Sequence, residues 1–331
     1  VYSAASVTAI GVSAAPTPVV YTVGTFTAGG GFLTCYPPGV AGVNPAGPIG
    51  YLAGAATTLM RPEGVTASSV TGLFYATDFS NTALDEWQLS CPSGQLNVGP
   101  VRQLQGGLTQ MGGPIGVAVD ASRNVIYVAN YHGSTVTMYH LNQNGNVAPV
   151  CVLAGLATRL SLPEHIAIEP AVAGARHSGY LYVANLGNNS VSVYPPVPCG
   201  NIAPFNRIAG PLTGLHRPTG IDVYTTRFPG HKGPAIYVAD PATSEISVYT
   251  DGGGANRAPF QIIGGAPSML ACPNDVRVSA ATLLIYAVDP CAMEIDAYAN
   301  TTPFNMAPFL WYVAPGGFVD NAFGVWLSDR N

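Results

Sequence analysis

Short apolar stretches with β character recur along the chain, with turn residues between them. A typical group begins with "PxGIxV", continues with "IYVA[ND]" and "VSVY", and ends in a stretch that closes with "IAG". Short runs rich in Val, Ile, Tyr and Thr and bounded by Gly, Pro, Asn or Asp are typical of strands. The pattern therefore predicts a unit of four strands, which we name a, b, c and d in chain order.

This unit repeats through nearly the whole chain. The strand-b tyrosines are spaced by 49 to 55 residues, and an aromatic residue follows each of the last five after twelve residues. An "N-x-A-P"-like segment comes next, at Asn97, Asn146, Asn201, Asn256 and Asn305, with a degenerate copy at Asn44. The strand-b tyrosines are Tyr21, Tyr75, Tyr127, Tyr182, Tyr237 and Tyr286, and their partners are Tyr36, Trp87, Tyr139, Tyr194, Tyr249 and Tyr298.

Six copies of an amphipathic four-stranded sheet predict an all-β, six-bladed β-propeller, because radial stacking buries both faces of each sheet. The blades are expected near 14–54, 61–107, 113–156, 162–211, 217–265 and 272–315 of one domain spanning 1–331. The first copy has strands b, c and d, and "AFGVWLSD" within 320–329 reads as its missing strand a. We expect this C-terminal strand to close the ring by pairing with the N-terminal strand, with Val7–Val12 as the competing candidate.

The repeats "PIGVAVDASRNVIYVANYHGSTVTMY" and "RPTGIDV…AIYVADPATSEISVY" resemble NHL-type and YVTN-type propeller repeats. The resemblance implies the fold over nearly the whole chain. It implies no single activity, because that superfold includes binding modules, scaffolds, lactonases and a lyase.

Composition narrows the classes of partner. Only 9% of residues are charged, the net charge is −5 and Lys232 is the single lysine, which argues against nucleic acid. The sequence contains no run of about 18 consecutive apolar residues, so no membrane-spanning helix is predicted. No signal-peptide pattern opens the sequence, so Val1 is expected to be a mature end if a leader is removed.

The residue after each strand-a proline is expected to line the rim of the central channel. These residues are Glu63, Ile115, Glu164, Thr219 and Asn274, with Phe323 or Ile10 as the sixth. His165, Asp275, Asp320, Asn321, His132 and His216 are expected on the same face, and His177 and His231 on the opposite one.

A divalent cation, Ca or Zn, is one hypothesis for this rim. Resemblance to gluconolactonase-type propellers, which hold an ion with Glu, Asn and Asp from strand-a ends, implies Glu63, Asn274, Asp275 and Asp320 as ligands. Such an ion polarises a lactone or ester carbonyl. Resemblance to an amidating-lyase propeller implies instead a zinc-type trio of His132, His165 and His216. The alternative to both metal sites is an ordinary solvated rim. It is supported by Ile115 and Phe323, which are apolar and could not bind a metal ion at two of the six rim positions.

Two repeated polar features read as structural. Asn130, Asn185, Asp240 and Asp289 end strand b, where Asx side chains bond nearby backbone and shape the b–c turn. The strand-c aromatic ladder is expected to pack between blades, not to form a sugar platform. Neither is assigned a ligand.

The cysteines predict disulfides and an oxidising compartment, extracellular or periplasmic. Cys272 and Cys291 are expected on one face of one blade and form the best pair. Cys151 with Cys199 would link neighbouring blades, which leaves Cys35 with Cys91; six cysteines allow about 15 connectivities.

Charge is also distributed unevenly. Residues 1–60 and 297–319 contain no Asp, Glu, Lys or Arg, and they are neighbours in the predicted ring. Because interface cores are depleted of charge, one hypothesis is that this sector contacts a protein partner or another copy. The alternative is a Thr-, Ser- and Gly-rich surface of the kind typical of secreted proteins with few charges. The favoured function is a secreted or cell-surface propeller that serves as a non-catalytic binding or structural subunit, and the alternative is a metal-dependent lactonase or hydrolase at the channel mouth.

Overall fold

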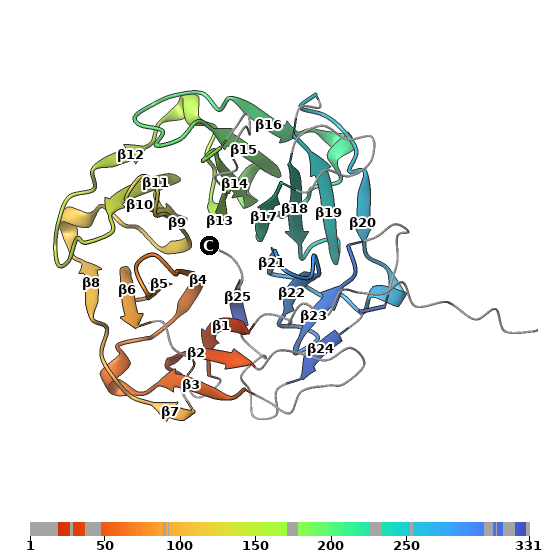
Figure 1. Cartoon of the computed structure of the whole chain (residues 1–331). Coiled ribbons are helices and arrows are strands. Elements are labelled where there is room, and N and C mark those ends of the chain that lie inside the picture. The colour runs from red at the N-terminus through yellow and green to blue at the C-terminus, as the bar shows by residue number, and fades with distance from the viewer. Residues whose placement is uncertain are drawn as a thin grey trace, which may run out of the picture.

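The computed structural model describes residues 19–26, 29–36, 48–88, 91, 93–170, 178–225, 234–251, 254–300, 307–308, 310–313 and 322–328. They form six small sheets arranged around one axis, so the expected six-bladed propeller is confirmed (Figure 1). Within these residues the only helical segments are single 3-10 turns. No helix among them is long and apolar enough to cross a membrane.

Each blade runs from the axis outward in the order a, b, c, d. Blade two holds β4 (Pro62–Ser68), β5 (Leu73–Asp78), β6 (Ala83–Gln88) and β8 (Arg102–Gln105). Blade three holds β9 (Pro114–Asp120), β10 (Val125–Asn130), β11 (Thr135–His140) and β12 (Cys151–Leu153). Blade four holds β13 (Pro163–Ile168), β14 (Leu181–Asn185), β15 (Ser190–Tyr194) and β16 (Asn206–Ala209).

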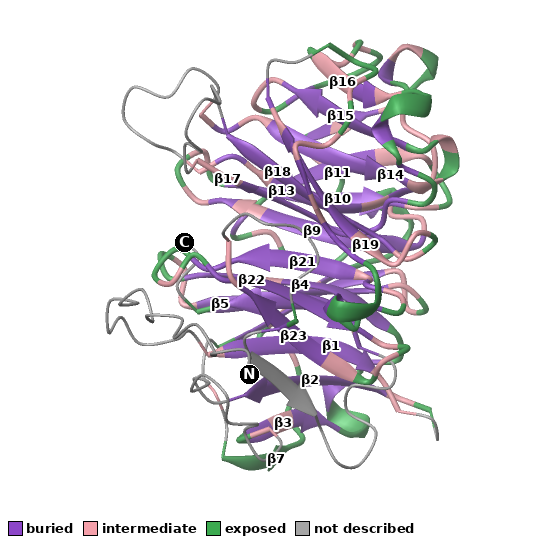
Figure 2. Ribbon diagram, turned by 90° about the vertical axis from the view of Figure 1, so that its right-hand side faces the viewer, coloured by how far each residue is buried: buried purple, intermediate pink, exposed green. Residues whose placement is uncertain are grey.

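Blades five and six follow the same plan. Blade five holds β17 (Ile221–Tyr224), β18 (Ala235–Asp240), β19 (Glu245–Thr250) and β20 (Gln261–Ile263). Blade six holds β21 (Asp275–Val278), β22 (Ile285–Asp289), β23 (Glu294–Tyr298) and β24 (Leu310–Val313). Figure 2 shows the inner and middle strands buried, with exposed residues mainly at their ends and on the outer edge.

Blade one closes the ring. Its inner strand is the C-terminal β25 (Ala322–Leu327), which pairs antiparallel with β1 (Val20–Thr25), followed by β2 (Gly31–Tyr36) and β3 (Gly50–Ala53). The expected closure by the two chain ends is confirmed, and Val7–Val12 lies outside the described residues. One strand was not expected: β7 (Gly94–Leu96), from blade two, adds in parallel to the edge of β3. It covers an edge that would otherwise present unpaired backbone groups.

The "N-x-A-P" signature joins one blade to the next. The Oδ1 atoms of Asn97, Asn146, Asn201 and Asn256 each accept a 2.8 Å bond from a backbone N–H in the 3-10 turn that ends the preceding blade. The glycine before each turn has φ between 109° and 121°, and the asparagine carboxamide fills the space that a side chain would need there. The "AG" ending and the next blade's asparagine are therefore two halves of one contact.

The strand-c tyrosines make a second set of links between neighbouring blades. Tyr249 Oη donates to the carbonyl of Thr213 at 2.5 Å, and Tyr298 Oη to that of Ser268 at 2.6 Å; Tyr139 and Tyr194 bond Thr109 and Thr158 in the same way. All four rings are fully buried. The expectation that this ladder is inter-blade packing is confirmed.

Several carboxyl groups are buried inside blades. Asp85 on β6 is fully buried; its Oδ1 accepts a 2.7 Å bond from Gln103, while its Oδ2 has no hydrogen-bond partner among the described residues. Burial raises the pKa of Asp85 to about 7, assisted by the negative charges of Asp78 and Glu86, although the bond from Gln103 opposes the shift. The folded protein therefore keeps this proton to a higher pH than the unfolded chain does.

The resulting pH dependence is testable with Asp85→Asn. Because the folded pKa lies above the unfolded value of about 4, the parent should lose stability as pH rises from about 4 to about 7, and level off above that. The Asn variant retains an oxygen for Gln103 but cannot ionise, so it should flatten this part of the profile and exceed the parent at neutral pH. Urea unfolding across this range measures the effect, and a variant with the parent's slope contradicts it.

Candidate functional site: the mouth of the central channel

Six inner strands surround the axis, and their starting residues form the channel mouth. The strands are β25, β4, β9, β13, β17 and β21, and each contacts the next around the ring. Glu63, Ile115 and Glu164 stand at the starts of β4, β9 and β13, while Thr219 and Asn274 directly precede β17 and β21. Phe323 lies at the start of β25. The residues that the repeat predicts for the rim thus occupy equivalent places in the six blades.

The inner strands approach so closely that most blades require glycine after the rim residue. A Cβ atom at Gly324 would lie 2.6 Å from the carbonyl oxygen of Glu63, and one at Gly220 would lie 2.5 Å from the Cα of Asp275. Gly64 and Gly116 are equally confined against the next blade. The two remaining ring positions carry His165 and Asp275 instead, and these two residues face each other.

His165 and Asp275 form a buried polar pair at the centre of the ring. The Nε2 atom of His165 lies 3.9 Å from Oδ2 of Asp275, and His165 is only 1% exposed. Neither imidazole nitrogen has a hydrogen-bond partner among the described residues. Burial lowers the pKa of His165, although the charge of Asp275 acts in the opposite direction, so the imidazole is neutral at neutral pH.

Asp275 and Asn274 also hold the strand that closes the ring. Asp275 Oδ2 accepts the backbone N–H of Val325 at 3.1 Å, and Asn274 Nδ2 donates to the carbonyl of Phe323 at 2.7 Å. Asp275 Oδ1 lies 2.9 Å from Nη1 of the buried Arg277. The "PND" segment of blade six therefore ties β25 to its neighbour by side-chain bonds.

Arg61 and Glu63 form one corner of the mouth. Arg61 Nε lies 2.6 Å from Oε1 of the buried Glu63, and its guanidinium carbon lies 4.5 Å from the centre of the Phe79 ring and 5.8 Å from that of Phe323. Burial raises the pKa of Glu63 to about 7 against the attraction of Arg61. Phe79 also contacts the ring of His132, with the ring centres 5.1 Å apart.

Glu164 is partly exposed and lies in the same electrostatic field. Burial raises its pKa to about 8, the charge of Glu63 raises it further, and Arg217 and Arg61 act in the opposite direction. Two carboxyl groups and two guanidinium groups therefore share the mouth, and at neutral pH Glu164 is largely protonated. Pairs of interacting carboxyl groups with shifted pKa values are typical of functional sites.

The sequence did not single out the two arginines, although a signal was present. The motif R-P-x-G occurs twice, at 61–64 and 217–220, in blades two and five. The backbone N–H of Arg61 donates to Asp78 and that of Arg217 to Asp240, both at 3.1 Å. The two blades are three places apart in a ring of six, so the motif puts one arginine on each side of the mouth.

The role of the Asx residues that end strand b, Asn130, Asn185, Asp240 and Asp289, differs in detail from the one predicted. Each accepts bonds mainly from the loop that leads into strand a of its own blade: Ser161 N–H donates to Asn185, and Gly112 N–H to Asn130, both at 3.1 Å. Asp240 and Asp289 also bond the b–c turn, through Ala242 and Ala292. Their role is structural as expected, but they shape the rim loops as much as the turns.

The residues proposed to hold a divalent cation are otherwise engaged. Asp275 already has Arg277 and Val325 as partners, the Asn274 amide bonds Phe323, Glu63 is paired with Arg61, and Asp320 lies outside the described residues. The described members therefore do not fit a ligand set for Ca or Zn. The donor atoms of His132, His165 and His216 likewise do not gather within 4.8 Å of one another; in the described part of the chain only Cys272, Asp289 and Cys291 do.

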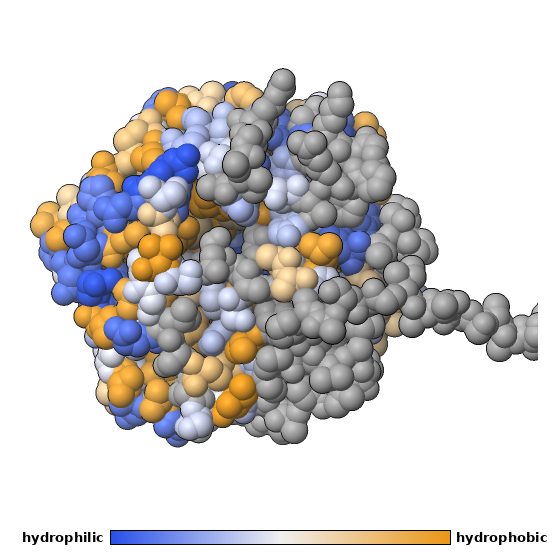
Figure 3. Space-filling view, viewed as in Figure 1, coloured by the Kyte–Doolittle hydropathy of each residue, from blue (hydrophilic) through white to orange (hydrophobic). Residues whose placement is uncertain are grey.

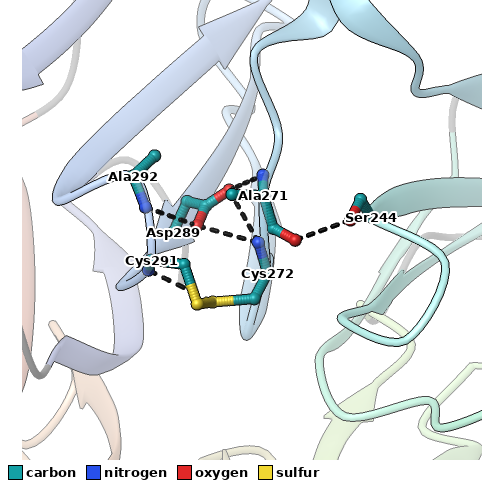
Figure 4. The surroundings of a disulfide bond; sticks show 6 residues. All are labelled: Ser244, Ala271, Cys272, Asp289, Cys291 and Ala292. Atoms are coloured by element: carbon teal, nitrogen blue, oxygen red, sulfur yellow. Dashed lines mark hydrogen bonds between the residues drawn. A yellow bond between two sulfur atoms is a disulfide. The ribbon is translucent and has the colours of Figure 1, made fainter.

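That last group is a disulfide environment (Figure 4). Cys272 and Cys291 are bonded, with Cα atoms 5.5 Å apart, and Asp289 accepts the backbone N–H groups of Ala271, Cys272 and Ala292. The other bonds are Cys35–Cys91 and Cys151–Cys199, so the structure joins the same three pairs that the sequence favoured. Cys151–Cys199 links blades three and four, and Cys35–Cys91 fixes the segment that leads to β7.

Comparisons with known proteins agree on the architecture. A family model described as "Lactonase, 7-bladed beta-propeller" matches residues 46–194, less than half of the chain, whereas this structure has six blades. No curated protein matches. A solved structure titled as a functionally unknown protein from Desulfotomaculum acetoxidans DSM 771 matches with a TM-score of 0.54 and 11% identity, over 85% of this chain and 75% of that one. At that identity the likeness concerns the fold alone, and the resemblance to NHL-type repeats stays a prediction.

The ring-closing role of Asp275 gives a stability prediction. Asp275→Ala leaves the Arg277 guanidinium buried without its carboxylate and removes the bond to β25, so the free energy of unfolding should fall by about 3–5 kcal/mol. Asp275→Asn keeps an oxygen for Val325 and should lose less. Chemical denaturation measures both, and an Ala variant within about 0.5 kcal/mol of the parent, the range of ordinary surface changes, contradicts the role.

Proposed function

We propose that this protein is a secreted β-propeller that acts by binding, with a small ligand at the channel mouth and a protein contact on its uncharged sector. The observation that carries the proposal is the convergence of Arg61, Glu63, Glu164 and Arg217 on the rim, where four ionisable groups share one opening. In a chain with only 9% charged residues, this is an unusual concentration. Three disulfides are compatible with a secreted or periplasmic location.

The uncharged sector supports the second contact. A cavity of about 430 Å³ lies between blades one and two, lined by uncharged residues that include Phe26, Tyr51 and Met60. Met60, which lines the cavity, is 53% exposed, and Ile49, which directly precedes β3 in the same sector, is 44% exposed. On the face seen in Figure 3, hydrophobic and hydrophilic side chains intermingle over blades two and three. We assign the sector to a second copy of this chain, because the same charge-free surface on both partners avoids the burial of any unpaired charge.

A charge placed in the sector tests this contact. Ile49→Lys should weaken self-association about tenfold or more, since an interface core does not accommodate an unpaired ammonium group. Val70→Lys is the matched control, because Val70 is an equally apolar residue, 77% exposed, on blade two outside the sector. Sedimentation over a range of concentrations measures association. A parent protein that remains strictly monomeric, or two variants with the same effect, contradicts the proposal.

Hydrolysis of lactones is the second candidate function, and the partial family-model match favours it. In this version Glu164 acts as general acid or base, because its raised pKa of about 8 allows it to exchange a proton near neutral pH. The chain's own residues would supply this step. Metal polarisation of the carbonyl stays a separate prediction that the described side chains do not support.

Titration of acid release from a panel of γ- and δ-lactones decides between the candidates. If the enzyme reading holds, Glu164→Gln should lower the rate by about 10²-fold or more, and a chelator should leave the parent's rate unchanged. If binding alone is the function, the parent should release no acid above the uncatalysed rate. Catalysis that the chelator abolishes would restore the metal hypothesis.

A further inference from the structure

The cavity in the uncharged sector is built where the chain departs from its own repeat. Fifteen residues separate Tyr21 from Tyr36 in blade one, whereas twelve separate the two aromatic residues in each other blade, so the turn from β1 to β2 is longer. Strand β7 forms another wall; at the same edge of blades two and three, the next blade supplies only a one-residue parallel bridge. The Cys35–Cys91 disulfide fixes the segment that leads to β7. The longer turn, the added strand and the disulfide therefore meet at one cavity.

The cavity has the size and lining of a site for a neutral molecule. Its volume of about 430 Å³ falls within the range of about 300–1,000 Å³ that is usual for small-molecule sites. None of the twelve described residues that line it is charged. A Cβ atom at Gly29 or Gly30 would meet nothing within 4 Å, so this part of the turn leaves the cavity open. A charged ligand would lose its hydration here without gaining a counter-ion.

Gln95 on β7 supplies a fixed polar anchor. Its Oε1 accepts the hydroxyl of Tyr51 at 3.0 Å, and its Nε2 donates to the carbonyl of Ala53 at 3.2 Å. A carboxamide has two N–H donors and two acceptor lone pairs, of which these bonds use one each. Gln95 is exposed, so a ligand can reach it. A donor and an acceptor side by side match two neighbouring hydroxyl groups, because each hydroxyl both donates and accepts.

Phe26 and Tyr51 supply aromatic surface beside this anchor. Both residues line the cavity and are only partly buried. The ring of Phe26 packs on that of Phe32, with the ring centres 4.9 Å apart, and the Tyr51 hydroxyl is bonded to Gln95. Aromatic rings attract C–H groups, whose hydrogens carry a small positive charge, to their faces. Held rings next to a carboxamide therefore suit a ligand with an apolar C–H face and hydroxyl groups at its edge, which is the chemistry of a sugar ring.

We propose that this cavity binds a neutral carbohydrate of one or two sugar rings. In this site Gln95 bonds a pair of neighbouring hydroxyl groups, and Phe26 and Tyr51 pack on the C–H face of the sugar. The site goes beyond the proposed function, which places a small ligand at the channel mouth and a protein contact on the sector. Ile49, where that contact is tested, is not among the described residues that line the cavity, so the two can be tested separately.

The methyl glycosides of glucose, galactose and mannose are suitable probes. Each has a charged counterpart of the same ring, the methyl uronide, in which a carboxylate replaces the C6 hydroxymethyl group. Isothermal titration of the full-length protein near neutral pH should show that at least one neutral glycoside binds, about tenfold or more tightly than its uronide.

Two variants test the assigned site. Gln95→Ala should weaken binding of that glycoside about tenfold, because it removes both bonds to the hydroxyl pair. Ala55→Trp should abolish binding, because it fills the cavity from its exposed rim and removes no bond to β7. Gln88→Ala is the matched control, since Gln88 is an exposed glutamine at the end of β6 and is not among the described lining residues. The control should bind as the parent does.

Three results would overturn the proposal. If no neutral glycoside binds at tens of millimolar, the cavity is not a carbohydrate site, while the channel-mouth and self-association proposals are unaffected. If the uronides bind as tightly as the neutral glycosides, the ligand class is wrong. If either Gln95→Ala or Ala55→Trp leaves binding unchanged, the sugar binds elsewhere on the protein.

Discussion

The convergence of six inner strands on one axis constrains everything else in this molecule. Strands β25, β4, β9, β13, β17 and β21 approach until backbone meets backbone, and Gly64, Gly116, Gly220 and Gly324 leave no room for a side chain. Buried polar groups usually need partners, and Asn274 and Asp275 have theirs on β25, whereas the imidazole nitrogens of His165 have no hydrogen-bond partner among the described residues. The ring also has to close without a covalent bond between its ends, and Asn274 and Asp275 of blade six supply the bonds to β25.

Outside the axis, the blades hold one another through repeated polar contacts as well as apolar packing. An asparagine from each of blades two to five caps the 3-10 turn that ends the preceding blade, and a strand-c tyrosine bonds the same turn in most of the ring. Trp87 replaces that tyrosine in blade two, and its indole nitrogen finds no partner among the described residues. These contacts depend on fixed spacing, which explains why the repeat is regular where it is buried and variable at its loops.

Most of the architecture could be predicted because the repeat carries it. The period, the strand-c aromatic residues and the lone C-terminal strand a together specify six blades and their closure. The parallel strand β7 could not be predicted, since Gly94–Leu96 is short and exposed and has no apolar alternation. Only part of the site at the channel mouth could be predicted from the sequence. The repeat predicted the rim positions. The bonds from Asn274 and Asp275 to β25 could not be predicted, because they depend on which blades become neighbours. The two R-P-x-G arginines could be recognised as rim residues only once blades two and five were seen on opposite sides of one opening.

The mouth is the place where two blades depart from the repeat, because His165 and Asp275 stand where the other four blades have glycine. Asp275 uses that place to hold the strand that closes the ring. The most direct test of this account is hydrogen exchange of the backbone amides of β25 in the parent and in Asp275→Ala. The account predicts that the Val325 amide exchanges slowly in the parent and much faster in the variant. An unchanged exchange rate in the variant would contradict it.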